Sequence, residues 1–202
     1  MTKISDVIVV GGGIGGLAAA LAVNDTGKSV AVFEQAPEFG EVGAGLQLAP
    51  NALEVLDRLG VKEELLKYAV LPKRLVLKVA ALDLGEEFQE KFGQPYIVVH
   101  RSDLHRVLYE ACQKRGNIQF FTNSRIETAE QDGDTATIVL ENGDKYSADA
   151  VIGADGVKSN LRKLFIEDEP VNSAYVAYRG TIPIEEVPED ITLEDVVMWI
   201  GP

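Results

Sequence analysis

The chain has 202 residues, of which 46% are hydrophobic and 25% charged, a composition typical of a globular protein rather than a disordered or fibrous one. Its 19 Lys and Arg against 32 Asp and Glu give a formal net charge of -13, which argues against a nucleic-acid partner. Cys112 is the one cysteine, which excludes an internal disulfide and any cysteine-rich metal site. The sequence has no signal peptide and no apolar run long enough to span a membrane, so we expect a cytoplasmic protein with its thiol reduced.

The first 34 residues follow the order strand, glycine-rich turn, helix, strand. Residues 6–10 and 29–33 are short β-branched runs typical of strands buried in a parallel sheet, and residues 14–24 are apolar and helical in pattern. The glycines between the first strand and the helix fit G-x-G-x-x-G, and Glu34 ends the second strand. This order predicts a βαβ unit that binds a dinucleotide.

Each glycine of the motif has a separate task. Gly11 permits the tight turn off the strand, Gly13 lets the backbone approach a pyrophosphate, and Gly16 allows close packing of the helix. Ile14 and Gly15 begin the helix, whose free N–H groups and dipole supply the local positive potential that an acidic protein needs to hold a diphosphate. The alternative is a glycine turn that serves packing alone.

The acid at the end of the second strand bears on which dinucleotide binds. A carboxylate at Glu34, with Gln35 beside it, would accept hydrogen bonds from ribose hydroxyls and repel a 2'-phosphate. The sequence therefore predicts FAD or NAD rather than NADP at this site.

The rest of the chain alternates helical and strand patterns. Helices are expected at residues 50–59, 62–68, 103–115 with Ser102 as N-cap, and 157–165. Strands are expected at 75–84, 96–100, 118–122, 125–130, 135–140, 145–147 and 150–152. From Ala174 onward the pattern resembles antiparallel strands interrupted by an acidic connection.

Four blocks together resemble the class A flavoprotein monooxygenases that hydroxylate aromatic rings, typified by salicylate hydroxylase and 3-hydroxybenzoate 6-hydroxylase. They are the fingerprint at 11–34, GAGLQL with the Pro-Asn pair at 43–51, HRSDLH at 100–105 and GADGVKSNLR at 153–162. The resemblance covers nearly the whole chain. It implies an α/β fold, with a Rossmann-like FAD-binding domain of the GR2 type and the start of an antiparallel substrate-domain sheet.

The resemblance also implies a division into domains. Residues 1–72 and 101–170 would form the FAD-binding domain, and residues 73–100 and 171–202 would belong to the substrate domain. Two departures stand out. Residues 75–84 look too short for the family's two-stranded hairpin, with residues missing around Lys78 to Ala81. The family's third FAD motif, a Gly-Asp pair, is absent, because the pairs at 133–134 and 143–144 fall in hairpin turns. We therefore expect the N-terminal portion of such an enzyme.

Cofactor-binding residues follow from the same resemblance. Arg101 would lie over the FAD pyrophosphate, with a surface salt bridge to Asp103 as the alternative. Gln47 would lie near the flavin ring, and the main chain of Ile126 near the adenine. Glutamine has no accessible pKa, so it cannot serve as a general base.

The GADG block gives two further candidates. Asp155 and Arg162 would support both the FAD and the pyridine nucleotide, yet Asp155 could equally cap the helix that follows, and Arg162 could be a solvated helix residue.

Substrate contacts are assigned to Tyr178, Arg179 and Trp199, since the sheet beyond residue 170 would cover the flavin; packing in the core is the alternative for the two aromatic residues. No catalytic acid, base, nucleophile or metal ligand is identified. The implied reaction uses NADH or NADPH, O2 and a phenolic or benzoate-type ring, and the oligomeric state is not predicted.

Three alternatives remain open. One is a related FAD enzyme, an epoxidase or a reductase, acting on a non-aromatic substrate. Another is an FAD-binding fragment without turnover. The third, a simple NAD dehydrogenase, accounts for neither the Arg101 nor the Asp155 block.

Overall fold

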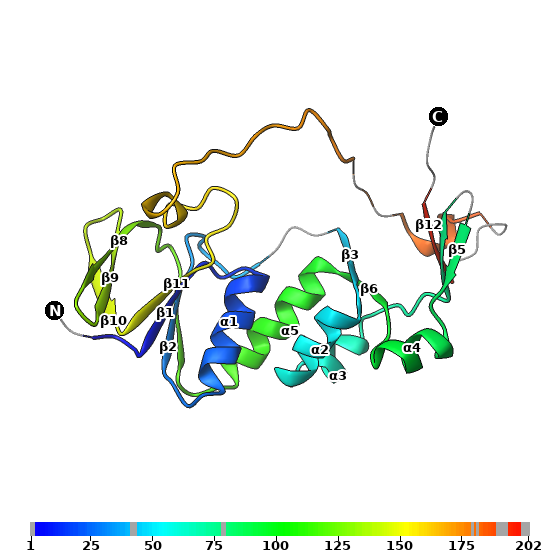
Figure 1. Ribbon diagram of the computed structural model, residues 1–202, viewed down its shortest axis with the longest axis horizontal. Helices are drawn as coiled ribbons and strands as arrows, with labels where there is room; N and C mark the ends of the chain where they lie inside the picture. The colour runs from blue at the N-terminus through cyan, green and yellow to red at the C-terminus, as the bar shows by residue number, and fades with distance from the viewer. Residues whose placement is uncertain are drawn as a thin grey trace. The chain divides into compact units, whose positions relative to one another are not determined.

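The computed structural model describes residues 3–40, 44–77, 80–178, 180, 182–188 and 194–198. The chain divides into two compact units, Met1–Glu41 with His105–Val176 and Val42–Leu104 with Ala177–Pro202 (Figure 1). Within the described ranges, no helix is both long and apolar enough to cross a bilayer.

The first unit is built on a four-stranded parallel sheet. Its strands are ordered β11 (Ala150–Gly153), β1 (Val7–Val10), β2 (Val30–Phe33) and β7 (Ile118–Phe121). The residues of β2 are buried at every position, which explains why this strand is a continuous apolar run rather than an alternating one. The predicted strand–helix–strand order at the N-terminus is confirmed.

Two helices accompany this sheet. α1 (Ile14–Asn24) packs on β1 and β2. α5 (Arg101–Gln113) lies beside α1, where Sγ of Cys112 is 3.5 Å from the Leu17 carbonyl oxygen (Figure 1). Cys112 is free and buried.

A second sheet covers the parallel one. It is antiparallel, ordered β10 (Lys145–Ala148), β9 (Thr135–Leu140) and β8 (Ile126–Asp132). A buried cluster joins the two sheets, and each fully buried aliphatic or aromatic side chain in it contributes about 1.5 to 3 kcal/mol. Its members include Ile8, Phe33, Ile126, Ile138 and Leu140.

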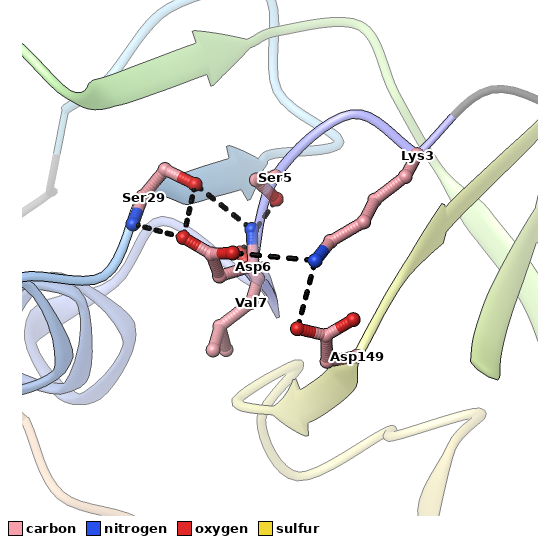
Figure 2. Close-up of polar contacts among 6 residues, drawn as sticks. All are labelled: Lys3, Ser5, Asp6, Val7, Ser29 and Asp149. Carbon is pink, nitrogen blue, oxygen red and sulfur yellow. Dashed lines mark hydrogen bonds and ion pairs between the residues drawn. The ribbon is translucent and has the colours of Figure 1, made fainter. Parts of the chain in front are cut away.

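Polar contacts tie together the starts of three strands of this unit (Figure 2). One carboxylate oxygen of Asp6 accepts hydrogen bonds from the Ser29 hydroxyl at 2.7 Å and the Ser29 N–H at 2.8 Å. Lys3 Nζ bridges the other oxygen, at 3.2 Å, to the Asp149 carboxylate, at 2.8 Å. The Ser29 hydroxyl, its backbone N–H and Lys3 hold the pKa of Asp6 well below its usual range.

The described residues of the second unit include two small sheets and several short helices. β3 (Gly45–Leu48) pairs antiparallel with β6 (Ile97–His100), and β4 (Arg74–Leu77) pairs antiparallel with β5 (Ala80–Asp83) and parallel with β12 (Asp195–Met198). The helices are α2 (Pro50–Arg58), α3 (Lys62–Leu66) and α4 (Glu86–Phe92). Arg74 binds the Asp195 carboxylate through two nitrogens, at 3.1 and 2.6 Å, which fixes β12 on β4.

Two expectations about helices are wrong. α5 begins at Arg101, so Ser102 is not its N-cap; the Ser102 hydroxyl instead contacts Nδ1 of His100 at 2.6 Å. The stretch 157–165 is not one helix. It consists of turns and the short 3-10 helix η1 (Arg162–Leu164), because the carboxylate of Asp155 draws the N–H groups of Asn160 and Leu161 into a tight loop.

Two further expectations differ from the structure, and one helix was not expected. Residues 75–84 do contain a two-stranded hairpin, since β4 and β5 pair with Leu77 opposite Ala80. α4 was not predicted. The expected antiparallel strands after Ala174 are wrong where the structure describes them: residues 174–178 form no strand, a 3-10 helix η2 (Ile184–Glu186) follows, and β12 pairs in parallel.

Candidate functional site

The glycine turn after β1 is closed by two contacts that only glycine permits. Gly11 has a φ of +108°, and a Cβ there would lie 2.2 Å from the Ala154 carbonyl oxygen. A Cβ on Gly16 would lie 1.8 Å from the Gly11 carbonyl oxygen. The turn therefore packs against the segment after β11 on one side and the first turn of α1 on the other, as the motif predicts.

The start of α1 is open. Gly13 is the N-cap with extended backbone, and the next three N–H groups have no partner within the helix by its geometry. Gly15 is exposed, and a Cβ there would meet nothing within 4 Å. The first turn carries no acidic residue, so the positive end of the helix dipole faces an accessible space suited to a diphosphate.

Glu34 lies directly after β2 and is half-buried. One carboxylate oxygen accepts the Gly12 N–H at 2.7 Å, and the other accepts the Ala36 N–H at 2.8 Å. Each carboxylate oxygen can accept a second hydrogen bond, so ribose hydroxyls could still bind there. The exposed side chain of Gln35 follows.

The carbonyl of Gly12 has a partner that the sequence did not suggest. Nε2 of His105 lies 2.8 Å from this oxygen, and His105 is only 4% exposed. His105 thus joins α5 to the glycine turn. Its position on the buried face of α5, with Leu108 and Cys112, is the signal that could have revealed this, because a buried polar group needs a partner.

An aromatic cluster lies over the same glycine. A Cβ on Gly12 would lie 2.3 Å from a ring carbon of Phe39. The Phe39 ring stacks on Tyr109 with a centroid separation of 4.6 Å, and both rings meet Phe120 edge-on. Sequence reasoning missed this cluster because its members come from a loop, a helix and a strand far apart in the chain.

The GADG segment has its own internal order. The Asp155 carboxylate accepts the Ser159 hydroxyl at 2.6 Å and two backbone N–H groups at 2.8 and 3.2 Å. Nε of Arg162 lies 3.1 Å from the Asp168 carboxylate. A hollow of about 1070 Å³ is lined by Asp155, Arg162 and the β8–β9 turn. No helix begins at Val157, so the expected helix-capping role of Asp155 is wrong; its carboxylate orders the loop instead. The cofactor roles of Asp155 and Arg162 stay predictions.

Ile126 has a buried side chain and a backbone carbonyl that accepts the Asn160 side-chain N–H at 3.0 Å. Its expected contact with adenine is untested. The two turn pairs, Gly133-Asp134 and Gly143-Asp144, lie in hairpin turns with positive φ at each glycine, as predicted.

The remaining predicted residues belong to the second unit. Gln47 is exposed on β3, where its side-chain oxygen accepts the Tyr96 hydroxyl. Arg101 is the first residue of α5, and its N–H donates to the Ala44 carbonyl at 3.1 Å. Tyr178 is 95% exposed, so the core role is wrong for it, while Arg179 and Trp199 lie outside the described residues.

A parallel βαβ sheet with a glycine turn, an open helix start and a carboxylate after the second strand defines a dinucleotide-binding protein. The chain belongs to the family of FAD-binding domains, whose model matches residues 4–187. The turn fits FAD, since its glycines leave backbone where side chains would fill the space. The predicted α/β FAD-binding fold and the cofactor class are thereby confirmed.

The chain is similar to flavoprotein hydroxylases. It is 42% identical to 3-hydroxybenzoate 6-hydroxylase of Polaromonas naphthalenivorans (strain CJ2), covering 97% of this chain and 51% of that protein. Its fold resembles p-nitrophenol 4-monooxygenase from Pseudomonas putida DLL-E4, with a TM-score of 0.74 and 26% identity over 80% of this chain and 43% of that one.

A further solved structure, Klebsiella pneumoniae HpxO complexed with FAD and uric acid, has a TM-score of 0.69 and 28% identity over 78% of this chain and 41% of that one. The chain thus spans about half the length of the relatives it matches. The resemblance drawn from the four sequence blocks is confirmed.

Proposed function

We propose that this chain is the FAD-binding part of a monooxygenase that hydroxylates a phenolic or benzoate-type ring with NADH or NADPH and O2. The observation that carries the FAD site is the glycine turn, held between Ala154, the start of α1 and Glu34. The likeness to 3-hydroxybenzoate 6-hydroxylase over 97% of the chain supports the reaction and the substrate class.

The chain's own residues would bind and orient the cofactor. The N–H groups at the start of α1 would hold the diphosphate, and Glu34 would accept ribose hydroxyls. Arg101 would add a planar cation for the diphosphate, which the net charge of -13 makes necessary. Bound FAD would supply the electron transfer and oxygen activation for which no side chain is needed.

The roles of Gln47, Ile126, Asp155 and Arg162 in holding the cofactor are part of this proposal, and so are those of Tyr178, Arg179 and Trp199 at the substrate. The domain boundaries inferred from the sequence and the expected cytoplasmic location also stay proposals.

The test uses the protein as its gene encodes it. We expect a flavin absorption spectrum after purification, NADH or NADPH oxidation that rises on addition of 3-hydroxybenzoate or a related phenol, and a hydroxylated product by mass spectrometry. A protein that does not bind FAD would contradict the proposal.

The alternatives give different results in the same assays. FAD binding without substrate-stimulated oxidation by either nucleotide would indicate a binding fragment. Turnover that yields an epoxide or a reduced alkene, with no ring hydroxylation, would indicate the related enzyme on a non-aromatic substrate.

A further inference from the structure

We propose that His105 is a positioning residue of the FAD site, which fixes the glycine turn in the conformation that receives the diphosphate. This inference rests on the proposed cofactor function. It starts from one buried contact, 2.8 Å between Nε2 of His105 and the Gly12 carbonyl oxygen. The carbonyl is an acceptor only, so the imidazole must carry a hydrogen on Nε2 and donate it.

The contact orients the peptide that matters most for binding. A trans peptide is planar, and its C=O and N–H point in opposite directions. Since His105 holds the Gly12 carbonyl, the N–H of Gly13 is directed away from His105. Gly13 is the motif position at which the backbone approaches the pyrophosphate. His105 therefore sets the direction of the Gly13 N–H, a donor that belongs to the backbone of the turn.

The preceding peptide is held as well. The N–H of Gly12 donates to Glu34 at 2.7 Å, so the peptides on both sides of the Gly12 Cα are fixed by side chains. The Phe39 ring occupies the position that a side chain on Gly12 would fill. The backbone of Gly12 is therefore restrained by three side chains from different elements, although Gly12 itself has no side chain.

Restraining the three consecutive glycines at 11–13 affects the free energy of FAD binding. Glycine has more backbone freedom to lose than any other residue, so ordering residues 11–13 on binding would cost affinity. A turn that is already ordered in the apoprotein avoids that loss. His105 is suited to this role because it is buried in α5 and shielded from competing water.

The experiment compares FAD affinity in three proteins, each as the full encoded chain stripped of flavin. His105→Phe keeps a ring of similar size and removes the donor. His105→Gln places an amide N–H at a reach similar to that of Nε2. We expect the dissociation constant for FAD, measured by flavin fluorescence on the folded fraction, to rise about tenfold in H105F and to return most of the way to wild type in H105Q.

Val107→Ala is the matched control. Val107 is 2% exposed on the same helix, two residues from His105, so its side chain leaves the helix in another direction. We expect V107A to lower the unfolding midpoint without changing FAD affinity. A merely structural role for His105 would give this same pattern in H105F and would overturn the proposal.

A measurement on the wild-type protein keeps the proposal testable if H105F does not fold. The ring nitrogens of His105 distinguish the two neutral tautomers by nitrogen NMR, and we expect hydrogen on Nε2. A neutral ring with hydrogen on Nδ1 alone would overturn the proposal. Failure of the wild type to bind FAD would overturn the proposed function together with this inference, whereas wild-type binding with unchanged affinity in H105F overturns the inference alone.

Discussion

At the scale of single residues, Glu34 orders the glycine turn through its carboxylate, and in the proposed function the same carboxylate would accept ribose hydroxyls. Glu34→Gln keeps the shape but removes the charge and one acceptor. Hydrogen bonds to a charged group contribute about 1.5 to 3 kcal/mol, so we expect FAD affinity to fall about ten- to hundredfold. Isothermal titration measures the change.

Glu38→Gln is the control for this variant, because Glu38 is exposed in the same segment and its replacement changes the net charge equally. Equal affinities in the two variants would mean that the effect of Glu34 is one of overall charge. Unchanged affinity in E34Q would remove the ribose assignment.

Cys112 illustrates how burial controls a side chain's chemistry. It is 0% exposed, and desolvation raises the pKa of its thiol to about 12. The reactive thiolate is therefore scarce at pH 8, and we expect a thiol reagent to label the native protein at least about a hundredfold more slowly than the urea-unfolded protein. Rapid labelling under native conditions would contradict the burial of this face of α5.

At the scale of elements, the junction of β1 and α1 depends on glycine at some positions and not at others. Gly16→Ala would place a Cβ 1.8 Å from the Gly11 carbonyl oxygen. Because this neighbour is a backbone atom, it cannot easily move to relieve the clash. We expect the apoprotein to lose about 2 kcal/mol or more of unfolding free energy, measured by urea denaturation.

Gly15→Ala is the natural comparison in the same turn of helix. A Cβ at Gly15 meets nothing within 4 Å, and alanine favours the helix by about 0.5 to 1 kcal/mol. We expect the G15A apoprotein to be as stable as the wild type or slightly more stable. A similar loss in both variants would show that the close approach of Gly16 to the Gly11 carbonyl does not explain the G16A result.

Elements with a strong local signal could be predicted from the sequence. The apolar run of β2 and the glycine turn before α1 follow from residue type and spacing alone. The stretch after Asp155 was expected to be helical because its composition suits a helix, but a single carboxylate captured its backbone N–H groups. The parallel pairing of β12 depends on an ion pair between Arg74 and Asp195, 121 residues apart, which no local pattern encodes.

The residues of the candidate site also divide into those that local sequence predicts and those that it does not. Gly11 and Gly16 were correctly assigned to the turn from their spacing, because glycine at these positions has a local steric cause. The contacts of His105 and Phe39 with Gly12 depend on how α5 and a loop pack on the turn. Such contacts are tertiary, and no local pattern of residues encodes them.

At the scale of the whole molecule, the polar cluster around Asp6 makes stability depend on pH. The pKa of Asp6 is lower in the folded protein than the usual 3.8, so its contribution is complete above about pH 4 to 5 and is lost as the pH falls toward the folded value. We expect the melting temperature to fall on acidification in this range, and Asp6→Asn to lower it by a few degrees at neutral pH while flattening the acid dependence.

Asp149→Asn provides the comparison, since it removes only the exposed ion pair with Lys3. Exposed pairs contribute little, so we expect a much smaller change in melting temperature, reduced further by salt. If D149N were as destabilised as D6N, the hydrogen bonds of Ser29 to Asp6 would not be the main source of stability in the cluster.

The register of the parallel sheet has a consequence for how the protein is made. β1 lies between β2 and β11, and Val7 pairs with Ala150, a residue synthesised 143 positions later. At the usual 5 to 20 residues per second, a ribosome takes roughly 7 to 30 s to cover that distance. During this interval one edge of the strand that carries the fingerprint is without its partner, and Gly11 has no Ala154 to pack against. The cofactor site therefore cannot form on a shorter nascent chain, however early its own motif emerges.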